Sequence, residues 1–289
     1  MSGPLVLESD ELEAVLLPEH GARLHRLRAF GVDLLRTPEE SAAHGSEPFF
    51  WGAYLMAPWC NRARPGPMTV AGRVVDLAPN FPDGSAIHGQ VYGRLWQDAG
   101  GGWLAVRGGG DGWPWAYEVR LRPTVSGSTL RLACRLTNRS DQPMPAGLGL
   151  HPWFVRPLEV GVPATAVYRS NMDSSVRPEP VEATAFDPRS TATPPRELDA
   201  TWTALTRPAI RLRWPATGIE AQLQIRTAPA ACLALATPAE PDATAVEPQT
   251  HGPDGLRRLI NGEPDALAML APDEGLGLDV RLTVRRLAR

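Results

Sequence analysis

The stretch YEVRLRPTVSGSTLRLACRL, residues 117–136, decides the fold class of this chain. Apolar residues alternate with charged or polar ones on both sides of its centre, at Tyr117, Val119 and Leu121 and then at Leu130, Leu132, Cys134 and Leu136. A period of two is typical of half-buried β-strands, whose side chains point alternately to the two faces of a sheet. The segment Pro123–Ser128 contains Gly127, which has the conformational freedom for a turn. The sequence therefore predicts a hairpin here.

The same alternation returns towards both ends of the chain. It covers Leu12–Leu17, which runs into a turn at Pro18–Gly21, then the pair Ala209–Trp214 and Ala221–Arg226, and finally Leu276–Val284. Helical periodicity is nearly absent. Many strands at short spacing, punctuated by Gly and Pro, favour an all-β fold, a large antiparallel β-sandwich or barrel, over a βαβ fold. We expect residues 1–289 to form a single domain, because large all-β domains reach this size.

Two glycine triplets, Gly100–Gly102 and Gly108–Gly110, invite comparison with phosphate-binding loops. Neither is followed by a helical pattern or by the Gly-Lys-Ser/Thr ending of such a loop. We interpret both triplets as turns. The segment Asn171–Arg196 is dense in Pro, Ser, Thr, Asp and Glu, and we interpret it as a long surface excursion.

The charge balance points to a neutral small molecule as the ligand. The net charge is −3 and the 29 basic residues are scattered, so no basic patch indicates nucleic acid or membrane as a partner. Cys60, Cys134 and Cys232 form no Cys-x-x-Cys pair, which argues against disulfides and a thiolate metal site. The amino terminus lacks a signal-peptide pattern, and no apolar run approaches the roughly 20 residues that span a bilayer. We expect a cytoplasmic protein, either a monomer or a weak homodimer.

Two histidines have distinctive surroundings. His88 lies in Ala86–Gln90, where the following glycine lets another group approach closely, and His151 lies in Gly147–Phe154. We place both at strand-to-loop transitions. A rigid β scaffold often carries functional residues at such positions, although a single histidine is more often structural.

Two further motifs contain charged residues. Glu247 follows the strand-like segment Ala231–Ala236 and precedes a proline; a solvated loop glutamate is the alternative interpretation. Asn61 and Arg62 open a hairpin-like segment that leads to His88, with an exposed ion pair as the alternative. The order of these motifs along the chain carries more information than any one of them.

In that order, the motifs resemble the galactose mutarotase-like aldose 1-epimerases. The matching segments are 17–24 (LPEHGARL), 33–36 (DLLR), 61–62 (NR), 72–80, 87–89 (IHG), 149–154 (GLHPWF), 198–199 (LD), 247–250 (EPQT) and 270–272 (LAP). The resemblance implies a large antiparallel β-sandwich, the galactose mutarotase-like supersandwich, with a sugar-binding cleft across one face. It also implies a small-molecule sugar, an aldohexose or a derivative, as the substrate, and neither a metal nor an organic cofactor.

The resemblance implies catalytic roles for three residues. Glu247 is expected to act as the base at the anomeric hydroxyl and His151 as the acid at the ring oxygen, with His88 assisting. Both proton transfers are needed to open a hemiacetal ring. In this scheme Glu247 must be ionised while His151 holds its proton.

The resemblance also implies a set of substrate-binding residues. They are Asn61, Arg62 and Asp199, and we add Trp153 because it lies close to His151 in the sequence. Glu197 and Asp187 are alternatives to Asp199 as the carboxylate that accepts hydrogen bonds from sugar hydroxyls. Trp59 joins Trp153 as a candidate for lining the cleft, because an aromatic ring packs well against the C–H face of a sugar.

Four alternative functions follow from the same residues. His88, His151 and Glu247 could hold a metal, but they lack the short spacing of zinc motifs. Glu247 with Asp199 could serve a glycoside hydrolase, which leaves both histidine motifs unexplained. A hexose-6-phosphate 1-epimerase would need a cation for the phosphate, such as Arg64 or Arg94. A non-catalytic carbohydrate-binding β-sandwich would keep the cleft without turnover.

Overall fold

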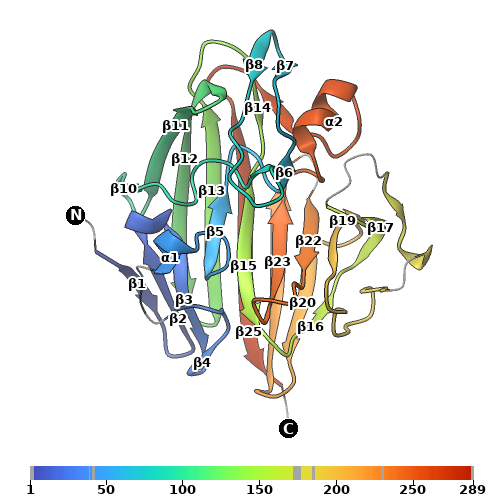
Figure 1. Cartoon of the computed structure of the whole chain (residues 1–289). Coiled ribbons are helices and arrows are strands. Elements are labelled where there is room, and N and C mark those ends of the chain that lie inside the picture. Colours follow the sequence, from blue (N-terminus) through green and yellow to red (C-terminus); the bar gives the residue numbers. More distant parts are fainter. Residues whose placement is uncertain are drawn as a thin grey trace.

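The structure, a computed structural model, is built from antiparallel β-sheets (Figure 1). It describes residues 3–38, 40, 43–171, 177–183, 186–228 and 231–287. About 51% of the chain is strand and 5% is helix, which confirms the all-β antiparallel prediction. No helix in these described segments is long and apolar enough to cross a membrane.

Two large sheets dominate the part of the chain that the structure describes, with eleven strands in the first and eight in the second. The first sheet has the order β1 (Leu5–Glu8), β2 (Leu12–Leu17), β3 (Arg23–Ala29), β5 (Ala53–Met56), β15 (Gly149–Val155), β23 (Ala243–Gln249), β22 (Cys232–Ala236), β19 (Asp199–Leu205), β17 (Ala164–Tyr168) and β18 (Glu179–Pro180), with β4 (Val32–Asp33) paired to β3. The second has the order β10 (Gln97–Asp98), β11 (Leu104–Gly110), β12 (Trp113–Ser126), β13 (Thr129–Asn138), β25 (Gly275–Arg286), β21 (Ile219–Thr227), β20 (Ala209–Trp214) and β16 (Glu159–Gly161).

Several short elements lie outside these two sheets. They are the strand pairs β6 (Arg62–Ala63) with β9 (Ala86–Ile87), β7 (Met68–Val70) with β8 (Arg73–Val75) and β14 (Met144–Ala146) with β24 (Ala268–Leu270), the helices α1 (Ala43–Ser46) and α2 (Gly255–Asn261), and 3-10 turns at Pro18–His20 and Val181–Ala183. Helix α2 has no counterpart in the sequence prediction. With seven residues it is too short to show a helical period clearly.

Strands β12 and β13 form the predicted hairpin. Its turn is shorter than expected, because Pro123 lies within β12 opposite Leu132, and only Gly127 and Ser128 connect the strands. Gly127 has the positive φ of 51° that the sequence argument assigned to it. The other predicted segments are strands as well and lie within β2, β20, β21 and β25.

The main core lies between the two sheets. Leu150 and Phe154 of β15 face Leu132, Leu223 and Val280 of the second sheet. Because side chains alternate along a strand, Pro152 shares this face, whereas His151 and Trp153 point to the opposite face of the first sheet. There a second apolar cluster forms, which includes Trp153. The first sheet is therefore buried on both faces around β15.

One of the two glycine triplets is not a turn. Gly100–Gly102 does form a turn, but Gly108–Gly110 is the end of β11, where the pairing with β12 shifts between Gly108 and Gly110. A Cβ on Gly108 would lie 2.1 Å from the ring of Tyr117. The missing side chain of Gly108 therefore leaves room for the buried ring of Tyr117, at the point where the pairing of β11 with β12 is irregular. From composition alone, this role of a glycine cannot be distinguished from a role in a turn.

The predicted excursion Asn171–Arg196 falls partly outside the described residues, which exclude 172–176 and 184–185. Its described part is not wholly irregular. Strand β18 pairs with β17 at the edge of the first sheet, and a 3-10 turn follows directly. The remaining described residues connect this edge to β19.

The glycine after His88 is set by a backbone contact. Gly89 has φ of 72° and forms a parallel bridge with Ala57, whose carbonyl also accepts a hydrogen bond from the Gln90 N–H at 2.7 Å. A Cβ on Gly89 would lie 2.0 Å from the Ala57 oxygen. The group that approaches Gly89 closely is therefore the backbone of Ala57, directly after β5. This contact fixes the position of His88, the residue before Gly89.

We predict that Gly89→Ala lowers the free energy of unfolding by more than about 3 kcal/mol, because it adds a backbone overlap to the strain of positive φ. The matched control is Gly84→Ala, since Gly84 has φ of 82° and nothing within 4 Å of an added Cβ. It should lose only about 1–2 kcal/mol. Urea denaturation measures both, and equal losses in the two variants would contradict this account of Gly89.

Candidate active site

A cavity of about 360 Å³ opens on the face of the first sheet that points away from the main core. Side chains from β15, β19, β22 and β23 line it, together with the segments around Phe49 and Phe81. A larger cavity of about 600 Å³ lies beside β16, β17 and β20, but no histidine lines it. Its carboxylate, Glu220, is already paired with Arg285 and Arg213. Acid-base chemistry is therefore concentrated in the smaller cavity.

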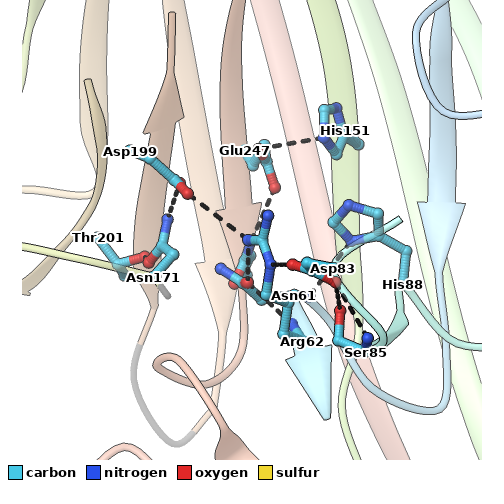
Figure 2. Close-up of polar contacts among 11 residues, drawn as sticks. Asn61, Arg62, Asp83, Ser85, His88, His151, Asn171, Asp199, Thr201 and Glu247 are labelled. Atoms are coloured by element: carbon cyan, nitrogen blue, oxygen red, sulfur yellow. Dashed lines mark hydrogen bonds and ion pairs between the residues drawn. The ribbon is translucent and has the colours of Figure 1, made fainter. Parts of the chain in front are cut away.

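His151 and Glu247 face each other from neighbouring strands (Figure 2). The register that pairs Gly149 with Gln249 and Trp153 with Ala245 sets them side by side. His151 Nε2 lies 3.2 Å from Glu247 Oε1, and both side chains are only 5% exposed. The expected strand-to-loop position of His151 is wrong, because His151 lies within β15. Glu247 lies buried within β23, which contradicts the alternative of a solvated loop glutamate.

Burial shifts both groups of this pair towards their uncharged forms. It raises the pKa of Glu247 to about 8, with a further rise from the negative charge of Asp199. It lowers the pKa of His151 to about 3, and the charge of Arg23 acts in the same direction. This differs from the expected ionised glutamate and protonated histidine. Between these two pKa values the pair as a whole holds one proton.

His88 approaches the same pair from the end of β9. Its ring is T-shaped to that of His151, with centroids 4.9 Å apart, and its φ is 63°. Nδ1 accepts a hydrogen bond from the Asn61 N–H at 3.3 Å. Burial, the neighbouring His151 and the charge of Arg62 lower the pKa of His88 well below its usual range. The neutral ring therefore carries its proton on Nε2.

Arg62 lies between two carboxylates (Figure 2). Its Nε donates to Asp83 Oδ2 at 2.7 Å, and its Nη1 lies 3.5 Å from Asp199 Oδ2. The Ser85 N–H and hydroxyl donate to Asp83. Asn61 Oδ1 accepts a hydrogen bond from the backbone N–H of Arg62, and this contact shapes the turn into β6. The predicted hairpin-like segment from Asn61 to His88 is the β6–β9 pair.

Asp199, at the start of β19, is the carboxylate that reaches Arg62. Asn171 Nδ2 donates to Asp199 Oδ1 at 2.6 Å, and Asn171 in turn accepts from Thr201. Burial raises the pKa of Asp199. Of the two alternatives, Glu197 also lines the cavity, whereas Asp187 does not and instead pairs with Arg189.

The two tryptophan candidates have different positions. Trp153 lines the cavity, with its ring 5.0 Å from that of His151. Trp59 does not line it, because its ring stacks on Trp113 and its Nε1 donates to Ala86 O. The sequence analysis missed Phe49, Phe50 and Phe81, which contribute to the cavity walls. The adjacent pair Phe49-Phe50 before β5 was the available signal.

The residues proposed for a phosphate lie elsewhere. Arg64 is 3.7 Å from Asp254, Arg94 is 3.2 Å from Asp111, and neither lines the cavity. Among the described residues there is no group of three or more His, Cys, Asp or Glu side chains placed to hold a metal ion.

Three solved structures share this fold along almost their whole length. A candidate aldose 1-epimerase of Escherichia coli K12 is 19% identical, with a TM-score of 0.81 over 98% of this chain and 99% of that one. A galactose mutarotase-like protein of Clostridium acetobutylicum is 14% identical, with a TM-score of 0.77 over 98% and 95% of the two chains. Galactose 1-epimerase of Lactobacillus acidophilus NCFM is 16% identical, with a TM-score of 0.76 over 99% and 95%. At these identities the likeness shows the fold.

The search of curated protein sequences gave no match. The family model for aldose 1-epimerase matches residues 5–250, which include every residue of the predicted site. Together with the galactose mutarotase-like fold, this match confirms the resemblance found in the sequence. The chain belongs to the aldose 1-epimerase family.

Proposed function

We propose that this protein is a mutarotase, which interconverts the α and β anomers of a free aldose by acid-base ring opening and closure. The observation that carries the proposal is the buried His151–Glu247 pair, 3.2 Å apart. It lies in a cavity of about 360 Å³, within the usual size of small-molecule sites. The three cysteines are buried free thiols, which supports a reducing, cytoplasmic location.

Ring opening uses both members of the pair. Glu247 takes the proton of the anomeric hydroxyl, His151 Nε2–H gives its proton to the ring oxygen, and the C1–O5 bond breaks to leave an open-chain aldehyde. The aldehyde rotates about C1–C2. Closure on its other face reverses both transfers and yields the opposite anomer.

The shifted pKa values fit this cycle. Ring opening leaves Glu247 protonated and His151 neutral, which is the uncharged pair that burial favours. The cyclic sugar reacts with the other tautomer of the pair, in which Glu247 is a carboxylate and His151 is an imidazolium. Gln249 Nε2 donates to Glu247 Oε2 at 2.9 Å, and the charge of Arg62 also lowers the pKa of Glu247. These two contacts favour the carboxylate and so oppose the effect of burial on Glu247.

The neighbouring groups bind the sugar and stabilise developing charge. Arg62 and His88 Nε2–H are donors for the ring or anomeric oxygen as negative charge develops there. Asp199 accepts hydrogen bonds from ring hydroxyls, with Asn61 shaping the turn that carries Arg62. Trp153 offers an aromatic face to the C–H groups of the sugar.

The charges of the cavity favour a free sugar over a phosphorylated one. Among the lining residues that the structure describes, Arg62 is the single guanidinium, and Asp83 and Asp199 already pair with it. Glu197, Asp199 and Glu247 contribute carboxyl groups. A phosphate carries about −1.5 to −2 charges at pH 7 and would meet these groups without a spare cation.

We predict that Glu247→Gln and His151→Asn each reduce the enzymatic rate of anomer exchange by about 10²–10⁴-fold, because each removes one of the two proton transfers. Polarimetry of freshly dissolved α-glucose and α-galactose, corrected for the spontaneous rate, measures this. Glu159→Gln is the matched control, since Glu159 lies on β16 beside Arg213 and away from the cavity.

Circular dichroism must show that the variants are folded. Sugar binding by the wild type without acceleration of anomer exchange would replace the enzyme proposal with the binding-module alternative. Full activity in folded Glu247→Gln would reject the assignment of the base.

We predict a bell-shaped dependence of kcat/KM on pH, set by the pair. Above pH about 8 the pair loses its only proton and the acid is lost, whereas below pH about 3 His151 takes a second proton and the base is lost. The enzymatic rate should therefore fall about tenfold per pH unit on the alkaline side. Initial rates between about pH 4 and pH 10, with the spontaneous rate subtracted, measure the alkaline limb.

Two variants should move this limb in opposite directions. Asp199→Asn removes a charge that raises the pKa of Glu247, so the limb moves to lower pH; Gln249→Met removes a hydrogen bond that lowers it, so the limb moves to higher pH. The position of the limb, rather than the size of the rate, is the readout. A limb that stays fixed in both variants would show that another group titrates.

A further inference from the structure

The cavity has two chemically different sides. The strand order β5, β15, β23, β22, β19 places His151 and Glu247 in the middle, with Asp199 two strands beyond Glu247. On that side lie Arg62, Asn171 and Asp199, which we call the polar side. On the β5 side lie Phe49, Phe50 and Trp153, which we call the aromatic wall.

The backbone carbonyls of the aromatic wall and the indole N–H of Trp153 form hydrogen bonds within the protein. The Phe49 carbonyl accepts hydrogen bonds from Trp153 Nε1 at 2.6 Å and from the Tyr54 hydroxyl at 3.2 Å. The Phe50 carbonyl accepts from Arg36 Nη1 at 3.0 Å. The carbonyls on either side, of Pro48 and Trp51, accept from the buried Arg23. Every carbonyl from residue 48 to residue 51 therefore has a side-chain donor.

The polar side keeps capacity for a ligand. Arg62 donates through Nε and Nη1, and its Nη2 has no hydrogen-bond partner among the described residues. The carboxylate of Asp199 is about a third exposed and has lone pairs beyond those that Asn171 and Arg62 occupy. Ala236 on β22 is small and lines the floor between Glu247 and Asp199. Sugar hydroxyls can therefore be satisfied over this floor.

The proposed mechanism orients a sugar between these sides. C1 is bonded to O1, O5 and C2, so a sugar with O1 at Glu247 and O5 at His151 has C5 beyond O5, on the His151 side. The ring of His151 stacks on that of Tyr54, with centroids 4.7 Å apart, and its centroid lies 5.0 Å from that of Trp153 in the aromatic wall. C5 is therefore directed towards this wall. The hydroxyl-bearing carbons C2 to C4 extend over Ala236 towards Asp199.

From this asymmetry we infer that the site selects aldoses that lack a hydroxyl on C6, namely 6-deoxyhexoses and aldopentoses. The inference rests on the proposed function, because the two catalytic residues set the orientation. A methyl group or hydrogen on C5 packs against Phe49, Phe50 and Trp153. A hydroxymethyl group instead brings a hydroxyl against aromatic rings and against carbonyls that already accept hydrogen bonds from side chains of the protein.

The test compares sugars that differ only at C6. Magnetisation-exchange NMR at anomeric equilibrium gives kcat/KM for D-galactose, 6-deoxy-D-galactose and L-arabinose, and for D-glucose, 6-deoxy-D-glucose and D-xylose. We expect the sugars without the C6 hydroxyl to exceed the parent hexose by at least about 10-fold in both series. Equal rates, or faster exchange of the hexoses, would overturn the inference and leave the proposed function intact. No acceleration with any sugar would reject both.

A matched pair of variants locates the selection. Trp153→Phe removes the Nε1–H that occupies the Phe49 carbonyl, so the preference should fall towards unity, whatever the change in overall rate. Trp51→Phe makes the same chemical change outside the cavity, where Nε1 donates to Glu47, and should leave the preference as in the wild type. The same preference in both variants would show that the aromatic wall does not select.

Discussion

Strand β15 faces two different environments at once, and the alternation of its side chains serves both. Leu150, Pro152 and Phe154 point into the core between the sheets, while His151 and Trp153 face the cavity. A slip of one residue in its pairing with β23 would exchange these faces, placing an imidazole in the core and leucine in the cavity. The antiparallel register from Gly149 to Val155 therefore fixes the core and the site together. The other site residues come from loops or from strands aligned on this one.

Placing the pair on strands rather than on loops determines its electrostatics. A central strand with apolar neighbours on both faces excludes water, so His151 and Glu247 each lose more hydration than a loop residue would. Burial therefore favours the uncharged form of each group, although the two lie 3.2 Å apart. Gln249 and Arg62 lower the pKa of Glu247, and Asp199 raises it. Rigidity has a further effect under the proposed function, since a pair held by sheet pairing would need little reorganisation during proton transfer.

The sequence predicted the regular parts of the fold because strands with one solvated face alternate visibly, as in β12, β13 and β25. It failed at β15, where every residue from Gly149 to Phe154 is buried and no alternation marks the strand. The order of motifs indicated the chemical groups, but not their partners. Asp83 is 21 residues from Arg62, and Asn171 is 28 from Asp199, so only the folded chain shows these contacts. Trp59 and the triplet at Gly108 were misread because packing, rather than composition, decides their positions.

Arg23 and Arg36 hold the backbone of residues 48–51 through hydrogen bonds to the carbonyls of Pro48, Phe50 and Trp51. The backbone conformation of this segment is therefore determined by Arg23 of β3 and by Arg36, rather than by the rings of Phe49 and Phe50. Substitutions at those two rings can change the chemistry of the wall while its backbone stays in place. Under the proposed function, single substitutions at these two rings would therefore change the sugar preference without insertions and without moving His151 and Glu247.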